Sequence, residues 1–239
     1  MPRIALALAL VGCAANAHTS VPPTAGGVDI PAPIALTKPW GVPGEGIEYA
    51  ASLRGLAVGR VVTAVGREGE VEGHPAIIVR SRGQSAGMVA LLADLTWELQ
   101  TTIALDDGTA LASREESSAV VAGEKRHDVR TMEGGLYDLH SAIAVVRGWR
   151  SLSGQTAKLG VSFGHHTLDA TMRDAGHGYL ASAHEPAVRY EGVVEDKVKF
   201  TAWVSDDIAR VPLRFECEIE TFGVHVVDLV HYSAPSDAP

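Results

Sequence analysis

Alternation of apolar and polar residues with a period of two dominates the chain after Trp40. In residues 212–220, Leu213, Phe215, Cys217 and Ile219 alternate with charged residues, so one face is predicted to join a core while the other meets solvent. The remaining β-like runs occupy residues 47–53, 57–65, 76–82, 95–103, 109–118, 125–132, 158–163, 167–172, 198–204 and 224–232. The pattern therefore predicts a mostly antiparallel β protein.

Two segments change to a helical period. Asp138 can cap a helix that ends at Gly148, where glycine suits a left-handed stop. The apolar stripe of this helix consists of Leu139, Ala142, Ile143 and Val146. A second, shorter helical turn is indicated by Met88, Val89, Leu91, Leu92 and Leu95.

The number of predicted strands limits the architecture. Ten or more strands are too many for one open sheet, so closure into a barrel, a half-barrel or a two-sheet sandwich is expected. We predict a mainly β fold: an antiparallel, closed or half-open β-barrel like that of lipocalins and lipoprotein carriers, with one or two short helices. A barrel of this size leaves an interior that can hold a ligand.

The N-terminus has the pattern of an export signal. The stretch "MPRIALALALVGCAANA" has one cation, Arg3, then an apolar run from Ile4 to Val11, then small residues. This apolar run is too short for a membrane-spanning helix, which needs about 20 residues. Leu10-Val11-Gly12-Cys13 resembles a bacterial lipobox, which implies a lipidated Cys13, whereas Ala15-Asn16-Ala17 fits ordinary cleavage before His18.

We favour lipidation, and the domain boundaries follow from it. Residues 1–12 are the predicted signal peptide, and residues 13–39 are the lipidated Cys13 with a Pro/Ala-rich tether. A single β-rich domain is predicted for 40–233 and a disordered tail for 234–239. Ala14 follows the cysteine, which favours the outer membrane facing the periplasm; cleavage before His18 would instead give a soluble periplasmic protein.

The charge of the chain limits the kinds of partner that it is expected to bind. The net charge is −9 and the pI about 5.5, with no basic run, so a nucleic-acid-binding surface is not expected. The same acidity disfavours electrostatic binding to anionic lipids. Membrane association is therefore predicted to occur through the N-terminal lipid anchor.

Four motifs follow one another along the folded region. They are Gly44-Glu45-x-x-x-Tyr49, the turn from Gly55 to Gly59, Tyr137-Asp138-Leu139-x-Ser141-Ala142 through Arg147, and Trp203-x-Ser205-Asp206-Asp207-x-x-Arg210-x-Pro212-x-Arg214. In this order they resemble the exported bacterial family catalogued as domain of unknown function 3108. The resemblance implies an envelope location and a β-rich architecture, and it leaves the mechanism open.

One motif suggests an enzyme. Gly83-Gln84-Ser85-Ala86-Gly87 is a formal G-x-S-x-G between a predicted strand and a helical turn, with Asp206 or Asp207 and then His225 or His231 later in the chain. A nucleophile elbow belongs to a parallel, helix-covered sheet, and no alternating βα pattern is present. A periplasmic serine hydrolase using Ser85, Asp206 and His231 is therefore the alternative, and we favour a strand-to-helix turn.

The remaining chemical candidates have structural explanations. Asp206 and Asp207 lie where a strand ends, Arg210 is near enough for an ion pair across the turn, and Pro212 suits the start of the next strand. Trp203, like Asp138 and Arg147, is assigned to structural motifs. The neighbouring histidines His165 and His166 would point to opposite faces of a strand, so no metal site is predicted, and no cofactor.

The leading hypothesis is a non-enzymatic envelope lipoprotein that binds an apolar or amphipathic ligand, or a protein partner, through a curved β-sheet. A purely structural or assembly lipoprotein is the third alternative.

Overall fold

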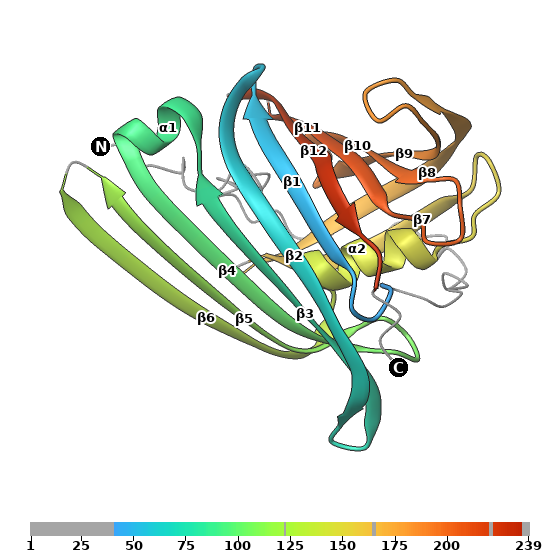
Figure 1. Ribbon diagram of the computed structural model, residues 1–239. Helices are drawn as coiled ribbons and strands as arrows, with labels where there is room; N and C mark the ends of the chain where they lie inside the picture. The colour runs from blue at the N-terminus through green and yellow to red at the C-terminus, as the bar shows by residue number, and fades with distance from the viewer. Residues whose placement is uncertain (1–40, 122, 164–165, 220–221, 236–239) are drawn as a thin grey trace, which may run out of the picture.

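The chain forms one long, curved sheet with two short helices in the computed structural model, which describes residues 41–121, 123–163, 166–219 and 222–235 (Figure 1). The first six strands are β1 (Gly46–Leu53), β2 (Leu56–Val71), β3 (His74–Ser85), β4 (Ala93–Ala104), β5 (Ala110–Val121) and β6 (Glu124–Leu136). The other six are β7 (Thr156–Phe163), β8 (His166–Leu180), β9 (Glu185–Val194), β10 (Val198–Ser205), β11 (Pro212–Ile219) and β12 (Gly223–Ser233). The helices are α1 (Gly87–Leu92) and α2 (Leu139–Gly148).

The sheet consists of two meanders that meet at β1 and β12. Its order is β6-β5-β4-β3-β2-β1-β12-β11-β10-β9-β8-β7, and each neighbouring pair is antiparallel. The edge strands β6 and β7 approach each other at an isolated parallel bridge between Tyr137 and Val161. The sheet is therefore not closed, and of the two predicted barrel types the half-open one is confirmed.

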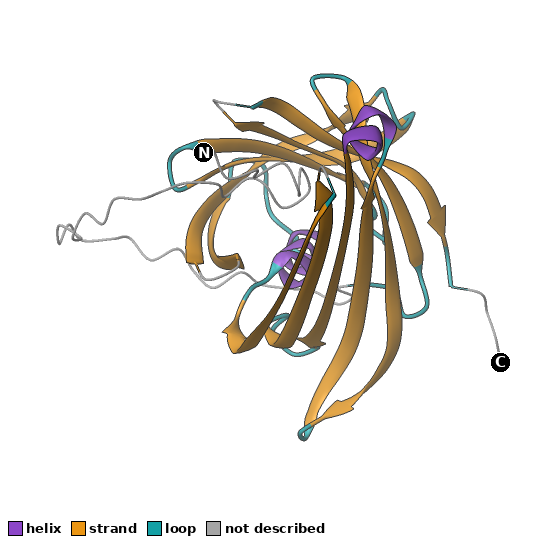
Figure 2. Ribbon diagram, turned by 90° about the vertical axis from the view of Figure 1, so that its left-hand side faces the viewer, coloured by secondary structure: helices purple, strands orange, loops and turns teal. Residues whose placement is uncertain are grey.

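The helix α2 lies inside the curve of the sheet (Figure 2). It joins the two meanders in sequence, and its buried Ala144 and Val145 pack with Ile77 of β3, Trp149 and Tyr190 of β9 in the main core cluster. A curved antiparallel sheet must cover its apolar concave face, and here part of that cover is a helix rather than a second sheet. In the described part of the chain, no helix is both long and apolar enough to cross a membrane.

The helix presents a different face to the core from its apolar stripe. Its buried residues are His140, Ser141, Ala144, Val145, Arg147 and Gly148. In contrast, Ile143 of the stripe is 37% exposed. Polar residues occupy the buried face because His140, Ser141 and Arg147 all have hydrogen-bond partners there, as described below. The sequence therefore predicted the helix and its N-cap Asp138 correctly, but not its orientation. The left-handed stop predicted at Gly148 is wrong, because Gly148 is still helical and the extended Trp149 is the C-cap.

The strand β9 was absent from the elements predicted by periodicity. It contains Pro186 near its start and Gly192 in its interior, and both residues weaken a strand signal. The structure uses Gly192 to make room, because a Cβ there would collide with the ring of Phe200 on β10. Packing against neighbouring strands thus overrides the weak local preference.

Candidate functional site

A capping box positions the start of α2 inside the barrel. The Asp138 carboxylate accepts hydrogen bonds from the backbone N–H of Ser141 (2.9 Å) and from its hydroxyl (2.8 Å). The Ser141 hydroxyl oxygen in turn accepts from the backbone N–H of Asp138 (2.7 Å). The predicted role of Asp138 as a helix cap matches this geometry.

A chain of buried side-chain hydrogen bonds continues from this cap across three strands. Thr101 of β4 donates to Asp138, and its hydroxyl oxygen lies 2.8 Å from Nδ1 of His140. On the other side of the imidazole, Nε2 lies 2.7 Å from the hydroxyl of Ser81 on β3, which is 2.6 Å from the hydroxyl of Thr63 on β2. We call these five residues the polar chain.

The direction of each bond in the polar chain follows from counting protons. The proton of Thr101 goes to Asp138, so Thr101 must accept from Nδ1–H of His140. This leaves Nε2 as the acceptor for Ser81, and Ser81 then accepts from Thr63. Every donor is used with a neutral imidazole. Consistently, burial lowers the pKa of His140 to about 4 against the opposing effect of Asp138.

The C-terminal half of α2 is held by a buried ion pair. Arg147 donates to both carboxylate oxygens of Glu45, with 3.0 Å between Nη2 and Oε2, and also to the backbone carbonyl of Ala209 (2.9 Å). The two charged side chains are 3% and 0% exposed. Burial, with the carboxylate of Glu45 as a second cause, raises the pKa of the neighbouring Tyr232, so this phenol stays neutral beside the pair.

Arg210 completes the end of the helix. Its Nε donates to the carbonyl of Arg147 (2.8 Å), and Nη2 donates to the carbonyl of Trp149 (3.3 Å) and to the hydroxyl of Tyr190. A helix leaves its last carbonyls without internal partners and carries partial negative charge there, which a buried guanidinium can compensate. The ion pair with Asp207 expected from the sequence is thus replaced by contacts with the end of α2.

The side chains of Asp206 and Asp207 point in different directions and have different partners. Asp207 accepts from the backbone N–H of Arg210 (2.9 Å) and from the hydroxyl of Ser205 (2.8 Å), so it stabilises the turn before Pro212. Asp206 points elsewhere and pairs with exposed His177 at 2.8 Å. The nearby Trp203 lies under the guanidinium of Arg214, 5.9 Å from the ring centroid. Asp206 and Asp207 therefore belong to a turn, as the sequence predicts.

The residues of the hydrolase alternative lie apart. The Ser85 hydroxyl donates to the carbonyl of Ala93 (3.0 Å) and accepts from the N–H of Leu95 (3.1 Å), which fixes both ends of α1. His231 is exposed on β12 opposite Glu48, on the outer face of the sheet. Two other described serines have histidine partners: Ser81 is buried within the polar chain, and Ser118 contacts His127 (3.0 Å) on the exposed surface.

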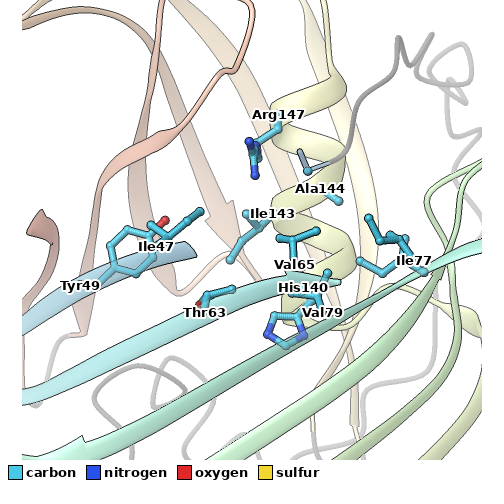
Figure 3. A pocket seen from close by; sticks show the side chains of 12 residues that line it. Ile47, Tyr49, Thr63, Val65, Ile77, Val79, His140, Ile143, Ala144 and Arg147 are labelled. Carbon is cyan, nitrogen blue, oxygen red and sulfur yellow. The ribbon is translucent and has the colours of Figure 1, made fainter. Parts of the chain in front are cut away.

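Small cavities remain beside α2. One of about 40 Å³ lies between the helix and strands β1 to β4, lined by residues such as Tyr49, Thr63, His140, Ile143 and Arg147 (Figure 3). This volume holds a few water molecules, whereas drug-sized ligands occupy roughly 300 Å³ or more. The space beside α2 is therefore not a site for a large ligand.

A second region of the concave face places a histidine in a row of apolar side chains. Strand register places Leu53, His225, Cys217 and Phe200 in one row across β1, β12, β11 and β10. His225 is 6% exposed, and within the described residues neither of its ring nitrogens has a hydrogen-bond partner. Burial lowers its pKa, so the imidazole is neutral at pH 7.

Sequence reasoning missed most of these polar groups. Ser81 and Thr101 occupy inward positions among apolar neighbours, and this interruption of the alternation was the available signal. His140 gave none, because its partner Ser81 lies 59 residues away. Glu45 belongs to a quoted motif, but its pairing with Arg147 could not be predicted across 102 residues. Cys13, the tether and His165 lie outside the described residues. Among the described residues, no group of three or more His, Cys, Asp or Glu side chains could hold a metal ion.

Comparisons with known proteins identify the fold and go no further. The chain matches no protein-family model and no curated protein sequence. A beta-barrel-like protein of domain of unknown function 1849 from Brucella abortus superposes with a TM-score of 0.55 at 9% identity, covering 83% of this chain and 100% of that one. A candidate exported protein with a YmcC-like fold from Bacteroides fragilis gives a TM-score of 0.34 at 11% identity, covering 81% and 97%, which is too low to support an inference. The resemblance to family 3108 stays a prediction, and the chain has a β-barrel-like fold shared with a domain of unknown function.

Proposed function

We propose that the chain is an exported, non-enzymatic envelope lipoprotein that binds an amphipathic ligand on the concave face around His225. The observation that carries the proposal is the buried imidazole of His225, for which the described part of the chain supplies no partner at either nitrogen. Buried polar groups in folded proteins are almost always hydrogen-bonded, and leaving one unpaired costs roughly 1–3 kcal/mol. A ligand that supplies the missing partner would recover this cost.

The surroundings of His225 suggest the chemistry of that ligand. The neighbouring Phe200 and Phe215 rings stack with centroids 5.7 Å apart, and Val227 lies next to His225 on the same face of β12. Such walls favour an alkyl or ring-shaped body. A neutral imidazole offers one N–H donor and one acceptor, so a hydroxyl or a protonated carboxyl group suits it.

The geometry gives the hydrolase alternative no support. The proton of Ser85 is already donated to Ala93, and no hydrogen bond within the described residues links Ser85 to a histidine. A serine nucleophile needs a base within hydrogen-bond reach. We therefore propose that Ser85 orders the turn that carries α1.

Native mass spectrometry tests the proposal directly. The protein is purified from a bacterial envelope and compared with a denatured sample and with His225→Leu. We expect an extra mass on the wild type that leaves on denaturation, and at least about tenfold lower occupancy in the variant. A bare polypeptide mass for wild type, or equal occupancy in both, would contradict ligand binding at His225 and favour a protein partner or a structural role.

The location is tested separately. If Cys13 is acylated, the mature protein begins at Cys13, carries the mass of its acyl chains and fractionates with the outer membrane. The variant Cys13→Ser should then become soluble. A mature N-terminus at His18 would instead establish the periplasmic alternative.

A further inference from the structure

Four exposed apolar side chains gather at one end of the sheet. In α1, Met88, Leu91 and Leu92 are 66%, 85% and 72% exposed, and Leu56 at the start of β2 is 61% exposed. The helix buries none of its residues and contacts β2 and β4 at this end of the molecule (Figure 1). We call Leu56, Met88, Leu91 and Leu92 the apolar tip.

Charged residues are missing from the segment that forms most of the apolar tip. Residues 83–93 contain none, and the β1–β2 turn before Leu56 carries one, Arg54, whose Nε donates to the carbonyl of Phe222 (3.0 Å). Several other connections of the sheet carry carboxylates, such as Glu72 in the β2–β3 turn and Asp106 in the β4–β5 turn. Exposed hydrophobic residues are common singly on protein surfaces, whereas an uncharged cluster marks an interaction site.

The apolar tip is held in place rather than frayed. The backbone N–H of Ala86 donates to the carbonyl of Val58 (3.0 Å), and Ser85 bridges Ala93 and Leu95. Gly87 has a φ of +58°, and a Cβ there would meet the carbonyl oxygen of Ala57 at 2.5 Å. The contacts around Ser85 thus hold α1 in a fixed position, although α1 buries none of its own residues.

The size of the apolar tip decides what can cover it. A stable protein interface uses about 20–30 residues on each side, with a polar rim around its core. The four side chains of the apolar tip are far fewer than such an interface needs, and residues 83–93 supply no charged residue to a rim around them. A second copy of the chain or another folded protein is therefore not the expected partner. A lipid bilayer requires only apolar side chains that can enter its acyl region.

We propose that the apolar tip inserts into the interface of a lipid bilayer, as a membrane contact separate from the predicted anchor at Cys13. Leu91 and Leu92 enter first, because they are the most exposed. Attraction to charged headgroups is not involved, so the contact is expected on zwitterionic lipid and changes little with salt. The proposal does not depend on the ligand at His225.

An environment-sensitive fluorophore on a single cysteine tests insertion. The mature protein carrying Leu91→Cys is labelled, since Cys217 is buried and Cys13 is predicted to be acylated or removed. The matched control is Leu152→Cys, because Leu152 is 78% exposed and lies in the connection between α2 and β7. Vesicles of phosphatidylcholine are then added.

We expect the probe at position 91 to shift to the blue and to lose quenching by aqueous iodide, while the probe at 152 changes neither. Equal responses at both positions, or none at 91, would overturn the proposal. A blue shift at 91 that grows with protein concentration without vesicles would also overturn it, in favour of self-association.

A second set of variants separates insertion from effects of the probe. With the label on Met88→Cys, the pair Leu91→Asp and Leu92→Asp should abolish the vesicle-induced shift, because two carboxylates oppose entry into hydrocarbon. The control pair Leu152→Asp and Ile208→Asp changes leucine and isoleucine side chains of similar exposure, 78% and 84%, and should leave the shift intact. A shift that survives Leu91→Asp and Leu92→Asp would contradict insertion.

Discussion

The two helices of this protein differ in where they place polar and apolar side chains. The longer helix, α2, places histidine, serine and arginine inside the barrel and gives each a hydrogen-bond partner. The shorter helix, α1, places methionine and leucines outside, where no described residue covers them. Inside, a polar group is stable only when paired, whereas outside an apolar group costs little until it meets a partner. The difference indicates that α2 maintains the fold, and it supports the proposal that α1 contacts a membrane.

Breaking the ion pair under α2 should have the largest effect. Arg147→Met leaves Glu45 charged and buried without its partner, so we expect a loss of about 3–5 kcal/mol in the free energy of unfolding, measured by urea denaturation. Adding Glu45→Gln to Arg147→Met should recover part of this loss. As a matched surface control, removing Arg173 from its exposed pair with Glu191 should cost about 1 kcal/mol or less. Equal costs for both arginines would contradict the comparison.

The polar chain predicts a specific dependence on pH. The pKa of His140 is about 4 in the folded protein, below its usual 6.5, so the unfolded state binds a proton first as the pH falls. Stability is therefore complete above pH 6.5 and is lost toward pH 4, by about 2 kcal/mol between about pH 7 and pH 5. Urea denaturation of His140→Gln over this range should show a weaker dependence. Burial also lowers the pKa of His225, so His225 should add to the remaining dependence with the same sign.

Removing the unpaired imidazole sharpens the comparison. His225→Leu replaces a buried group that has no partner by an apolar one, so we expect the free energy of unfolding of the ligand-free protein to rise by about 1–2 kcal/mol. The same variant should lose ligand, as described above. A structural role for His225 predicts the reverse sign, a loss of stability, and denaturation of ligand-free protein distinguishes the two.

Changes in α1 should have the smallest effect on stability. Leu91→Asp removes no buried contact, so we expect a change within about 0.5 kcal/mol in the free energy of unfolding. Circular dichroism and urea denaturation would check this alongside vesicle binding. A loss above about 2 kcal/mol would mean that Leu91 supports the fold, and the contrast between the two helices would fail.

The fold was largely readable because its signals are local. Alternation in residues 95–103 predicted β4 with its inward face correct, since Leu95, Trp97 and Leu99 are buried. Asp138 and Gly148 marked α2 within one residue. The site was less readable, because Thr63, Ser81 and His140 gain their roles from neighbours on other elements. The motif around Ser85 does mark a strand-to-helix turn, whereas the role of the Ser85 hydroxyl could not be predicted from the motif.

By itself, the sequence determined the strand-rich architecture and the two helices, because each depends on residues close together in the chain. The export signal at the N-terminus is read from equally local residues and stays a prediction. The tertiary structure decided which face of α2 is buried, where Arg210 points and that no described residue pairs with His225. These outcomes depend on pairing between residues far apart, such as Glu45 with Arg147. Periodicity measures how apolar a face is, but a polar face can be buried when the fold supplies its partners.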